Sequence, residues 1–284
     1  MRPAREAVYT READSTMPNL EEPTQRRRGT IQSVDRAARI LKALAAHPPR
    51  LGVSQLADEL RLSRPTVHAL LQTLQAHGFV EQDRHSDKYQ LGPGLLHLGS
   101  SYLDFNELRA RSLVHAERLA QHTGEAVRVG VLHGPSVVIV HHVFRPDAAF
   151  QVLEVGAQMP AHASALGKAI LAYQPDAVLA ELTAEPLPRL TSRTLAAAAL
   201  GAEVASVRDK GFARERDEAV LGESSVAAPI VDHAGHAVGA IAVVGETRRI
   251  FPRGPAKGLP EAIADAARSI SRELGAPRWP AAVP

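Results

Sequence analysis

The chain contains no cysteine among its 284 residues, and this absence excludes several kinds of chemistry at once. Without thiols there is no disulfide framework, no thiolate nucleophile and no cysteine-ligated zinc, which fits a cytoplasmic protein. No apolar run approaches the roughly 18 residues that a membrane-spanning helix requires. The first 19 residues mix both charges and lack an apolar core, so they do not resemble a signal peptide. We therefore expect a cytoplasmic protein without membrane contact.

The length of the chain suits two modest domains and linkers better than one small domain. Hydrophobic residues make up 45%, which is enough to fill ordinary cores. The net charge of +2 is uneven, because residues 26–92 hold 11 Lys and Arg against six Asp and Glu. This block therefore carries +5 and the rest of the chain −3. Such a bias fits a nucleic-acid partner for the basic block, and it fits an ordinary solvated surface equally well.

Three short helices followed by a hairpin are predicted between residues 29 and 92. The first helix is expected to bury a stripe made of Val34, Ala37, Ala38, Leu41, Leu44 and Ala45. Ser33, Ser54 and Ser63 can cap the three helices, and Pro65 fits the first turn of the third. Residues 79–82 and 88–91 are expected to form two strands around a polar turn. This order of elements predicts a winged helix-turn-helix.

The third helix is expected to leave its polar side bare. Its core side should consist of Val67, Leu70, Leu71 and Leu74. The first turn of a recognition helix usually reaches base edges. We therefore predict DNA contacts from Arg64, Thr66, His68 and Gln72, the last able to bond adenine. Arg84 and Lys88 on the wing are predicted to meet phosphates. A three-helix packing unit without a role on DNA is the alternative that the pattern leaves open.

The rest of the chain mixes β-rich runs with helical stretches, which indicates a second domain of mixed α and β structure. The expected strands are 125–132, 137–144, 150–155, 225–231 and 238–244. The expected helices are 95–103, 106–122, 165–173, 176–183, 195–210 and 260–274, with Asn106 as a cap. The predicted division is a disordered tail 1–28, a winged helix-turn-helix domain 29–92, a linker helix 93–105 and a second domain 106–277.

Three groups of motifs together resemble the IclR family of transcription regulators. They are 31–37 with 63–68 and 89–92, then 159–168, then 211–218 with 225–230. The resemblance covers about residues 30–275. It implies an α+β fold, with an N-terminal winged helix-turn-helix and a C-terminal GAF-like effector domain built on a curved antiparallel sheet. It also implies homodimers or tetramers that bind a palindromic double-stranded DNA operator.

Further stretches, among them 79–83, 107–111 and 138–147, resemble a narrower group within this family. That resemblance implies repression of an operon for glycerol uptake and use, released by a small metabolite, with glycerol 3-phosphate as the implied inducer. The family also holds activators of aromatic-acid catabolism, and this alternative stays open. The sequence has no phosphate-binding loop, nucleophile elbow or metal motif, so an enzyme is the remote alternative.

The resemblance places a small-molecule site between the curved sheet and the loop around residue 162. Carried over by position, the effector contacts are His162, Ser164, Ala165, Gly167, Glu215, Ser225, Ala242 and Val244. Ala242 and Val244 stand where some acid-binding members use serines, which argues against the same short keto acids as effectors. A phosphate-bearing effector would need a cation, and the sequence leaves Arg128, Arg145 and His162 as candidates.

Several other polar residues are interpreted as ordinary. Lys168 is assigned to the surface, because lysine is rarely buried. His141 and His142 are neighbours on a strand and should point to opposite faces, so they do not easily share a metal ion. Asp217 and Glu218 are adjacent as well and are not expected to face one site. We predict no metal, no cofactor and no catalytic residues.

Overall fold

The computed structural model describes residues 30–46, 50–104, 106–146 and 151–276. The chain divides into two compact units between Leu96 and His97, inside the helix that spans Gly94–Asp104. The predicted tail 1–28 lies outside the described residues. The finer division, with a separate linker at 93–105, stays a prediction.

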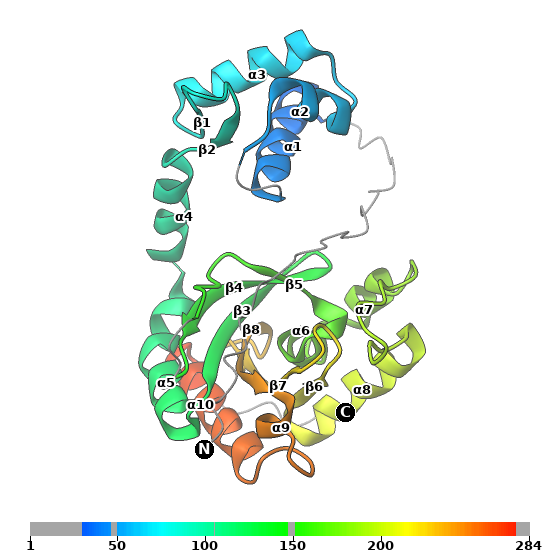
Figure 1. Cartoon of the computed structure of the whole chain (residues 1–284). Helices are drawn as coiled ribbons and strands as arrows, with labels where there is room; N and C mark the ends of the chain where they lie inside the picture. The colour runs from blue at the N-terminus through cyan, green and yellow to red at the C-terminus, as the bar shows by residue number, and fades with distance from the viewer. Residues whose placement is uncertain (1–29, 47–49, 105, 147–150, 277–284) are drawn as a thin grey trace, which may run out of the picture. The chain divides into compact units, whose positions relative to one another are not determined.

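The first unit holds three helices and a two-stranded antiparallel hairpin (Figure 1). Its elements are α1 Gln32–Ala46, α2 Val53–Leu60, α3 Arg64–Ala76, β1 Val80–Gln82 and β2 Tyr89–Leu91. One apolar core joins the helices to the hairpin, and its fully covered members include Ile40, Leu56, Val67, Leu71 and Tyr89. The predicted winged helix-turn-helix is confirmed.

Two of the three predicted helix caps were wrong. Ser63 does cap α3, but α2 begins at Val53 with Gly52 as its N-cap, so Ser54 lies inside the helix. The N–H of Gly52 donates to Oε1 of Gln55 at 2.9 Å, which satisfies the backbone donor of the N-cap residue. α1 begins at Gln32, which places Ser33 in its first turn.

The buried side of α1 also differs from the prediction. The helix buries Ile40, Ala43 and Leu44, whereas Val34 is 63% exposed and Ala38 and Ala45 are exposed as well. The sequence of α1 offers two apolar stripes, and periodicity alone does not tell which one packs on α2 and α3. In α3, Val67, Leu71 and Leu74 are buried as predicted, while Leu70 is half-buried.

A six-stranded antiparallel sheet forms the centre of the second unit, in the order β5-β4-β3-β8-β7-β6. Its strands are β3 Ala126–His133, β4 Ser136–Val143, β5 Gln158–Pro160, β6 Ala213–Arg216, β7 Glu223–Val231 and β8 Ala237–Glu246. The helices are α4 Gly94–Asp104, α5 Glu107–Thr123, η1 Ala161–Ala163, α6 Ala165–Leu171, α7 Asp176–Leu182, α8 Ala197–Lys210, α9 Thr247–Ile250 and α10 Leu259–Glu273.

The sheet is curved, with α6 in its hollow and α5 and α10 against its outer face (Figure 1). Each face has its own apolar core. The inner core joins α6 to Ala227, Ala242 and Val244, and the outer core joins α5 and α10 to Val127 and Val243. The predicted α+β fold with a curved antiparallel sheet is confirmed.

The predicted strand 150–155 does not form in its described part, residues 151–155. These residues run irregularly into a turn at Gly156, whose φ of +87° suits glycine, and Val152 and Leu153 are mostly exposed. Pairing with β4 is made instead by the short strand β5. The prediction also missed β6, because four residues that include Arg214, Glu215 and Arg216 carry little β signal.

Helix α5 sits very close to the sheet at one point. Asn106 caps the helix as predicted, with its Oδ1 accepting the N–H of Arg109 at 2.8 Å. A Cβ atom added to Gly239 on β8 would lie 2.4 Å from Cδ2 of Leu108 and 2.7 Å from the carbonyl oxygen of Gly130. Only glycine fits beside the carbonyl oxygen of Gly130, and its missing side chain leaves the space that Leu108 of α5 occupies.

Candidate functional site

The start of α3 is held by its own polar side chains. Ser63 Oγ accepts the N–H of Thr66 at 3.3 Å and lies 2.7 Å from Thr66 Oγ1. Pro65 stands in the first turn, where no backbone N–H is required. The hydroxyl of Thr66 therefore already has a partner in the cap, and this residue is half-buried.

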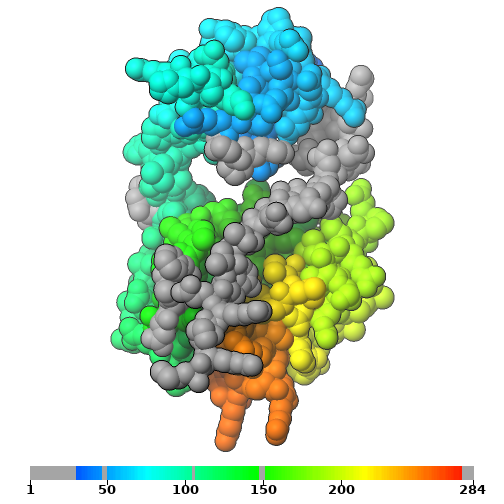
Figure 2. Space-filling view, in the orientation of Figure 1, coloured from blue at the N-terminus to red at the C-terminus, as the bar shows by residue number. Residues whose placement is uncertain are grey.

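The remaining predicted DNA contacts lie on open surface. Arg64, His68 and Gln72 are exposed along one side of α3, opposite the buried Val67 and Leu71. Figure 2 shows the helices of the first unit (blue to cyan) as part of its outer surface. The polar side of the helix is thus free of packing from the described residues of its own unit, as DNA reading requires.

The turn of the wing is well ordered by hydrogen bonds to Asp83. Its Oδ1 accepts the N–H groups of His85 at 2.8 Å and Ser86 at 2.9 Å, and its other oxygen pairs with Arg50. The two backbone hydrogen bonds lower the pKa of Asp83 below its usual value. This turn presents Arg84 and Lys88 as exposed cations.

On the hollow side of the sheet, Glu215 and Ser225 form a buried polar pair. The Ser225 hydroxyl donates to Glu215 Oε2 at 3.0 Å, and the N–H of Glu218 donates to Glu215 Oε1 at 2.7 Å. Val244 lies beside Ser225 on the neighbouring strand. Glu215 is only 4% exposed, and burial raises its pKa to about 7. The structure thus brings three of the predicted effector residues together.

Lys168 is fully buried, so its assignment to the surface was wrong. Its Nζ donates to Glu218 Oε1 at 2.7 Å, and all seven residues of α6 are buried in the hollow of the sheet. The sequence did carry a signal for this burial. The other residues of α6 are all apolar or small, so the helix has no polar side that could face solvent. Asp217 takes a left-handed conformation with φ of 58°, and its neighbour Glu218 is directed inward to Lys168.

The predicted loop residues have structural partners of their own. His162 is bonded through Nε2 to the carbonyl oxygen of Pro188 at 2.9 Å, and burial lowers its pKa, which favours the neutral ring. Ser164 caps α6 by accepting the N–H of Gly167 at 3.1 Å. Ala165 is buried, and Gly167 is pressed against the backbone of Ala161. These contacts fix the loop that leads into α6.

Arg128 belongs to the same inner face. It lies between His142 and Ala242 in the sheet, while its neighbours Val127 and Val129 pack into the outer core. Its guanidinium donates to Glu223 Oε1 at 2.9 Å and to Glu154 Oε1 at 2.7 Å. Arg128 is 7% exposed, so this cluster combines one buried cation with two carboxylates.

The adjacent histidines face opposite sides of β4, as predicted. The charges of Arg109 and Glu117 on α5 act on the pKa of His141, whereas the charges of Glu154 and Arg128 act on the pKa of His142. Burial is the main cause that lowers the pKa of both rings. Within residues 30–46, 50–104, 106–146 and 151–276, no cluster of three or more His, Asp or Glu side chains is suited to a metal ion.

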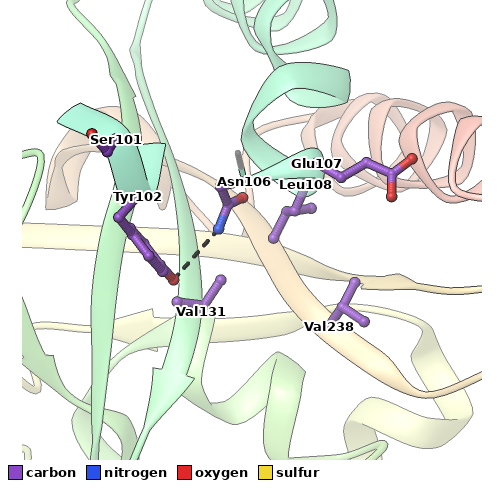
Figure 3. A pocket seen from close by; sticks show the side chains of 7 residues that line it. All are labelled: Ser101, Tyr102, Asn106, Glu107, Leu108, Val131 and Val238. Carbon is purple, nitrogen blue, oxygen red and sulfur yellow. Dashed lines mark hydrogen bonds between the residues drawn. The ribbon is translucent and has the colours of Figure 1, made fainter. Parts of the chain in front are cut away.

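A shallow hollow of about 620 Å³ lies elsewhere in the second unit, where the end of α4 and the start of α5 meet β3 and β8 (Figure 3). Leu108, Val131 and Val238 form its apolar floor, and Asn106 Nδ2 donates to Tyr102 Oη at 3.4 Å. None of the predicted effector residues lines it. None of the described helices is long and apolar enough to cross a membrane.

Comparison with known families accounts for both units. Residues 33–84 match the IclR helix-turn-helix domain, and residues 100–272 match the C-terminal domain of bacterial IclR transcriptional regulators. The chain belongs to the IclR family. It is a DNA-binding transcription regulator, with the helix-turn-helix in its first unit and the family's effector domain in its second.

Individual relatives of this IclR-family regulator are similar over nearly their whole length. It is 49% identical to the glycerol operon regulatory protein of Streptomyces griseus and 46% identical to that of Streptomyces coelicolor. Each alignment covers 88% of this chain and 98% of the relative. An IclR transcriptional regulator from Alicyclobacillus acidocaldarius has a similar structure, with a TM-score of 0.75 and 26% identity over 87% of this chain and 100% of that one.

Proposed function

We propose that this regulator represses an operon for glycerol uptake and use, and that glycerol 3-phosphate releases it from its operator. The observation that carries the proposal is the similarity to two glycerol operon regulatory proteins along 98% of their length. Similarity of this extent includes both the recognition helix and the effector domain. A repressor of this kind works on DNA in the cytoplasm and needs no cofactor or catalytic residue.

For the DNA interface, we propose that α3 enters the major groove. Arg64 and His68 project from its N-terminal half and contact bases, while Thr66 orders the first turn through Ser63 and approaches a nearby phosphate. Gln72 lies two turns along the same side and reaches adenine if the helix enters deeply. Arg84 and Lys88 of the wing bind phosphates.

We propose a homodimer, because the described residues of the single chain leave apolar side chains exposed. Ile31 and Val34 of α1 are 68% and 63% exposed, and Leu96 and Tyr102 of α4 are 73% and 57% exposed. Helix α4 contains no buried residue among those described, although an isolated helix of this length is marginal in water. We infer that a second copy covers these helices. Two recognition helices then meet successive major grooves about 34 Å apart on a palindromic operator, in a dimer or a pair of dimers.

For the effector, we propose a site on the inner face of the sheet. Glu215 and Ser225 supply the polar contacts, Ala242 and Val244 the floor, and the loop of His162, Ser164, Ala165 and Gly167 the cover. Effector binding shifts the balance between two states of the dimer, and it does so only if one state binds the effector more tightly.

The experiment is a DNA-binding titration with the full chain. A labelled fragment from upstream of the glycerol genes is bound in fluorescence anisotropy, and glycerol 3-phosphate is then added. We expect tight binding that weakens with salt and is lost when glycerol 3-phosphate is present. Release by an aromatic acid instead would replace the glycerol assignment with regulation of aromatic-acid catabolism. Turnover of a phosphate or ester by the pure protein would restore the enzyme alternative.

A further inference from the structure

The inner face of the effector-domain sheet carries the guanidinium of Arg128 between two carboxylates. We propose that Arg128 is the receptor for the anionic group of the effector, and that the carboxylate of Glu154 is a resident anion which the effector replaces. This inference rests on the proposed function, because it takes a small anionic effector on this face as given. The sequence left Arg128, Arg145 and His162 as candidates for the cation that binds the effector, and the inference chooses Arg128.

The position of Arg128 brings its charge over the predicted floor of the site. The residue stands on β3 and its guanidinium reaches Glu223 on β7, with β8 between the two strands. The side chain therefore crosses the inner face of β8, the strand that carries Ala242 and Val244. Burial at 7% exposure strengthens each interaction that the guanidinium makes, because little water competes.

The spacing along β7 suits a short molecule with two different ends. Glu223 and Ser225 are two residues apart on the same face, which corresponds to about 6.8 Å in an antiparallel strand. A phosphate on Arg128 beside Glu223 would leave the hydroxyl groups of a three-carbon chain near Ser225 and Glu215. A carboxylate or hydroxyl oxygen of these residues can pair with a hydroxyl group, which both donates and accepts.

The two carboxylates on Arg128 are held differently. Glu223 begins β7 and is opposite Glu246 of β8, so its backbone is part of the sheet. Glu154 is half-buried and pairs with Arg128 through both of its oxygens, but it belongs to the irregular segment 151–157 and not to a strand. Two carboxylates on one guanidinium leave an excess negative charge, which the arrival of a phosphate would increase. Departure of Glu154 relieves this excess and requires no change within a strand.

Lys168 and His162 are poorly placed for this role. Lys168 is fully buried and already bound to Glu218, and the cluster of Lys168, Glu215 and Glu218 holds two carboxyl groups for one ammonium. His162 is hydrogen-bonded to the carbonyl oxygen of Pro188. Its pKa is lowered, so the ring offers no positive charge near neutral pH. Arg128 is also a guanidinium, whose fork of N–H groups matches the oxygens of a phosphate.

The test is isothermal titration of the full chain with glycerol 3-phosphate and, separately, with glycerol. Glu154→Gln keeps the shape of the resident group but removes its charge, so the affinity for glycerol 3-phosphate should rise about tenfold. Arg128→Lys should lower that affinity by about tenfold or more, the range expected for a lost charge-assisted hydrogen bond. Glycerol, which carries no anion, should respond to neither substitution.

Asp176→Asn is the matched control. It removes the charge of another ion pair, in which Arg208 Nη2 lies 3.0 Å from Oδ1 of the exposed Asp176, and it should leave both affinities unchanged. Thermal melts of each variant separate loss of fold from loss of binding. A folded Glu154→Gln protein that binds glycerol 3-phosphate no more tightly than the parent overturns the inference.

The outcomes also separate this inference from the proposed function. If the parent ignores glycerol 3-phosphate but binds an aromatic acid, the glycerol assignment is lost. The role of Arg128 then stands only if Glu154→Gln binds that acid more tightly. A parent that binds neither class of anion overturns both proposals.

Discussion

Replacement of Lys168 by methionine leaves Glu218 buried without its cation. The Nζ–Oε1 distance of 2.7 Å and the complete burial of Lys168 make this pair a strong one. The second oxygen of Glu218, Oε2, is also buried and has no hydrogen-bond partner among the described residues. Removal of one member of a buried pair typically costs 3–5 kcal/mol, because the remaining charge has neither water nor a partner.

Protonation of Glu218 limits this cost, and the limit depends on pH. Bringing a carboxyl group with an ordinary pKa of 4.5 to its neutral form costs about 3 kcal/mol at pH 7 and less than about 1 kcal/mol at pH 5. The Lys168→Met protein should therefore be less stable than the parent by about 3 kcal/mol at pH 7. For a domain of this size the loss corresponds to a melting temperature lowered by about 6–12 °C.

Thermal melts of the parent and the variant at pH 5 and pH 7, followed by circular dichroism, measure the difference. Lys210→Met, at an exposed position of α8, is the control and should change stability by no more than about 0.5 kcal/mol. A double variant, Lys168→Met with Glu218→Leu, should recover most of the loss, since apolar replacement of a buried ion pair is often neutral. Equal destabilisation at both pH values would refute the argument that an uncompensated charge is the cause.

Further predictions concern titration, DNA reading and assembly. Because the pKa of Glu215 in the folded protein is raised to about 7, the folded state binds the extra proton and stability falls as pH rises from about 4.5 through 7. Urea unfolding across this range should show the fall, and Glu215→Gln should flatten it. Arg64→Ala should reduce the preference for operator over random DNA by about 1–3 kcal/mol in competition gel shifts, with ligand binding intact. An unchanged preference would contradict its role in base reading. Val34→Asp, which adds charge to the exposed stripe of α1, should shift sedimentation towards monomer, whereas Asp35→Asn, at an exposed neighbour, should not.

Local signals in the sequence identified most of the architecture. Ser63 and Pro65 marked the start of α3, and Asn106 marked that of α5, because caps and helix starts depend on a few adjacent residues. Spacing did not settle the packed side of α1, which has two apolar stripes. Which of them packs is decided by α2, α3 and the hairpin, and these contacts lie far apart in the sequence.

The candidate site was predicted less completely than the fold. The resemblance to the family, carried over residue by residue, identified Glu215 and Ser225 as candidate site residues. In the structure a hydrogen bond of 3.0 Å joins them. The ion pair between Glu218 and Lys168, 50 residues apart, was not predicted. Lysine is so rarely buried that the residue type alone assigned Lys168 to the surface. Arg128 was one of several candidate cations, and only the strand register places it on the inner face.

The close fit between Gly239 and Leu108 has a mechanical consequence. There is no room for another atom at this contact, so a displacement of β8 towards α5 presses first on the side chain of Leu108. β8 also bears Ala242 and Val244, so the proposed floor of the effector site and the contact with the start of α5 lie on a single strand. Gly239→Ala would press on the backbone of Gly130 as well as on Leu108, and we expect it to weaken the coupling between effector binding at the proposed site and release of DNA.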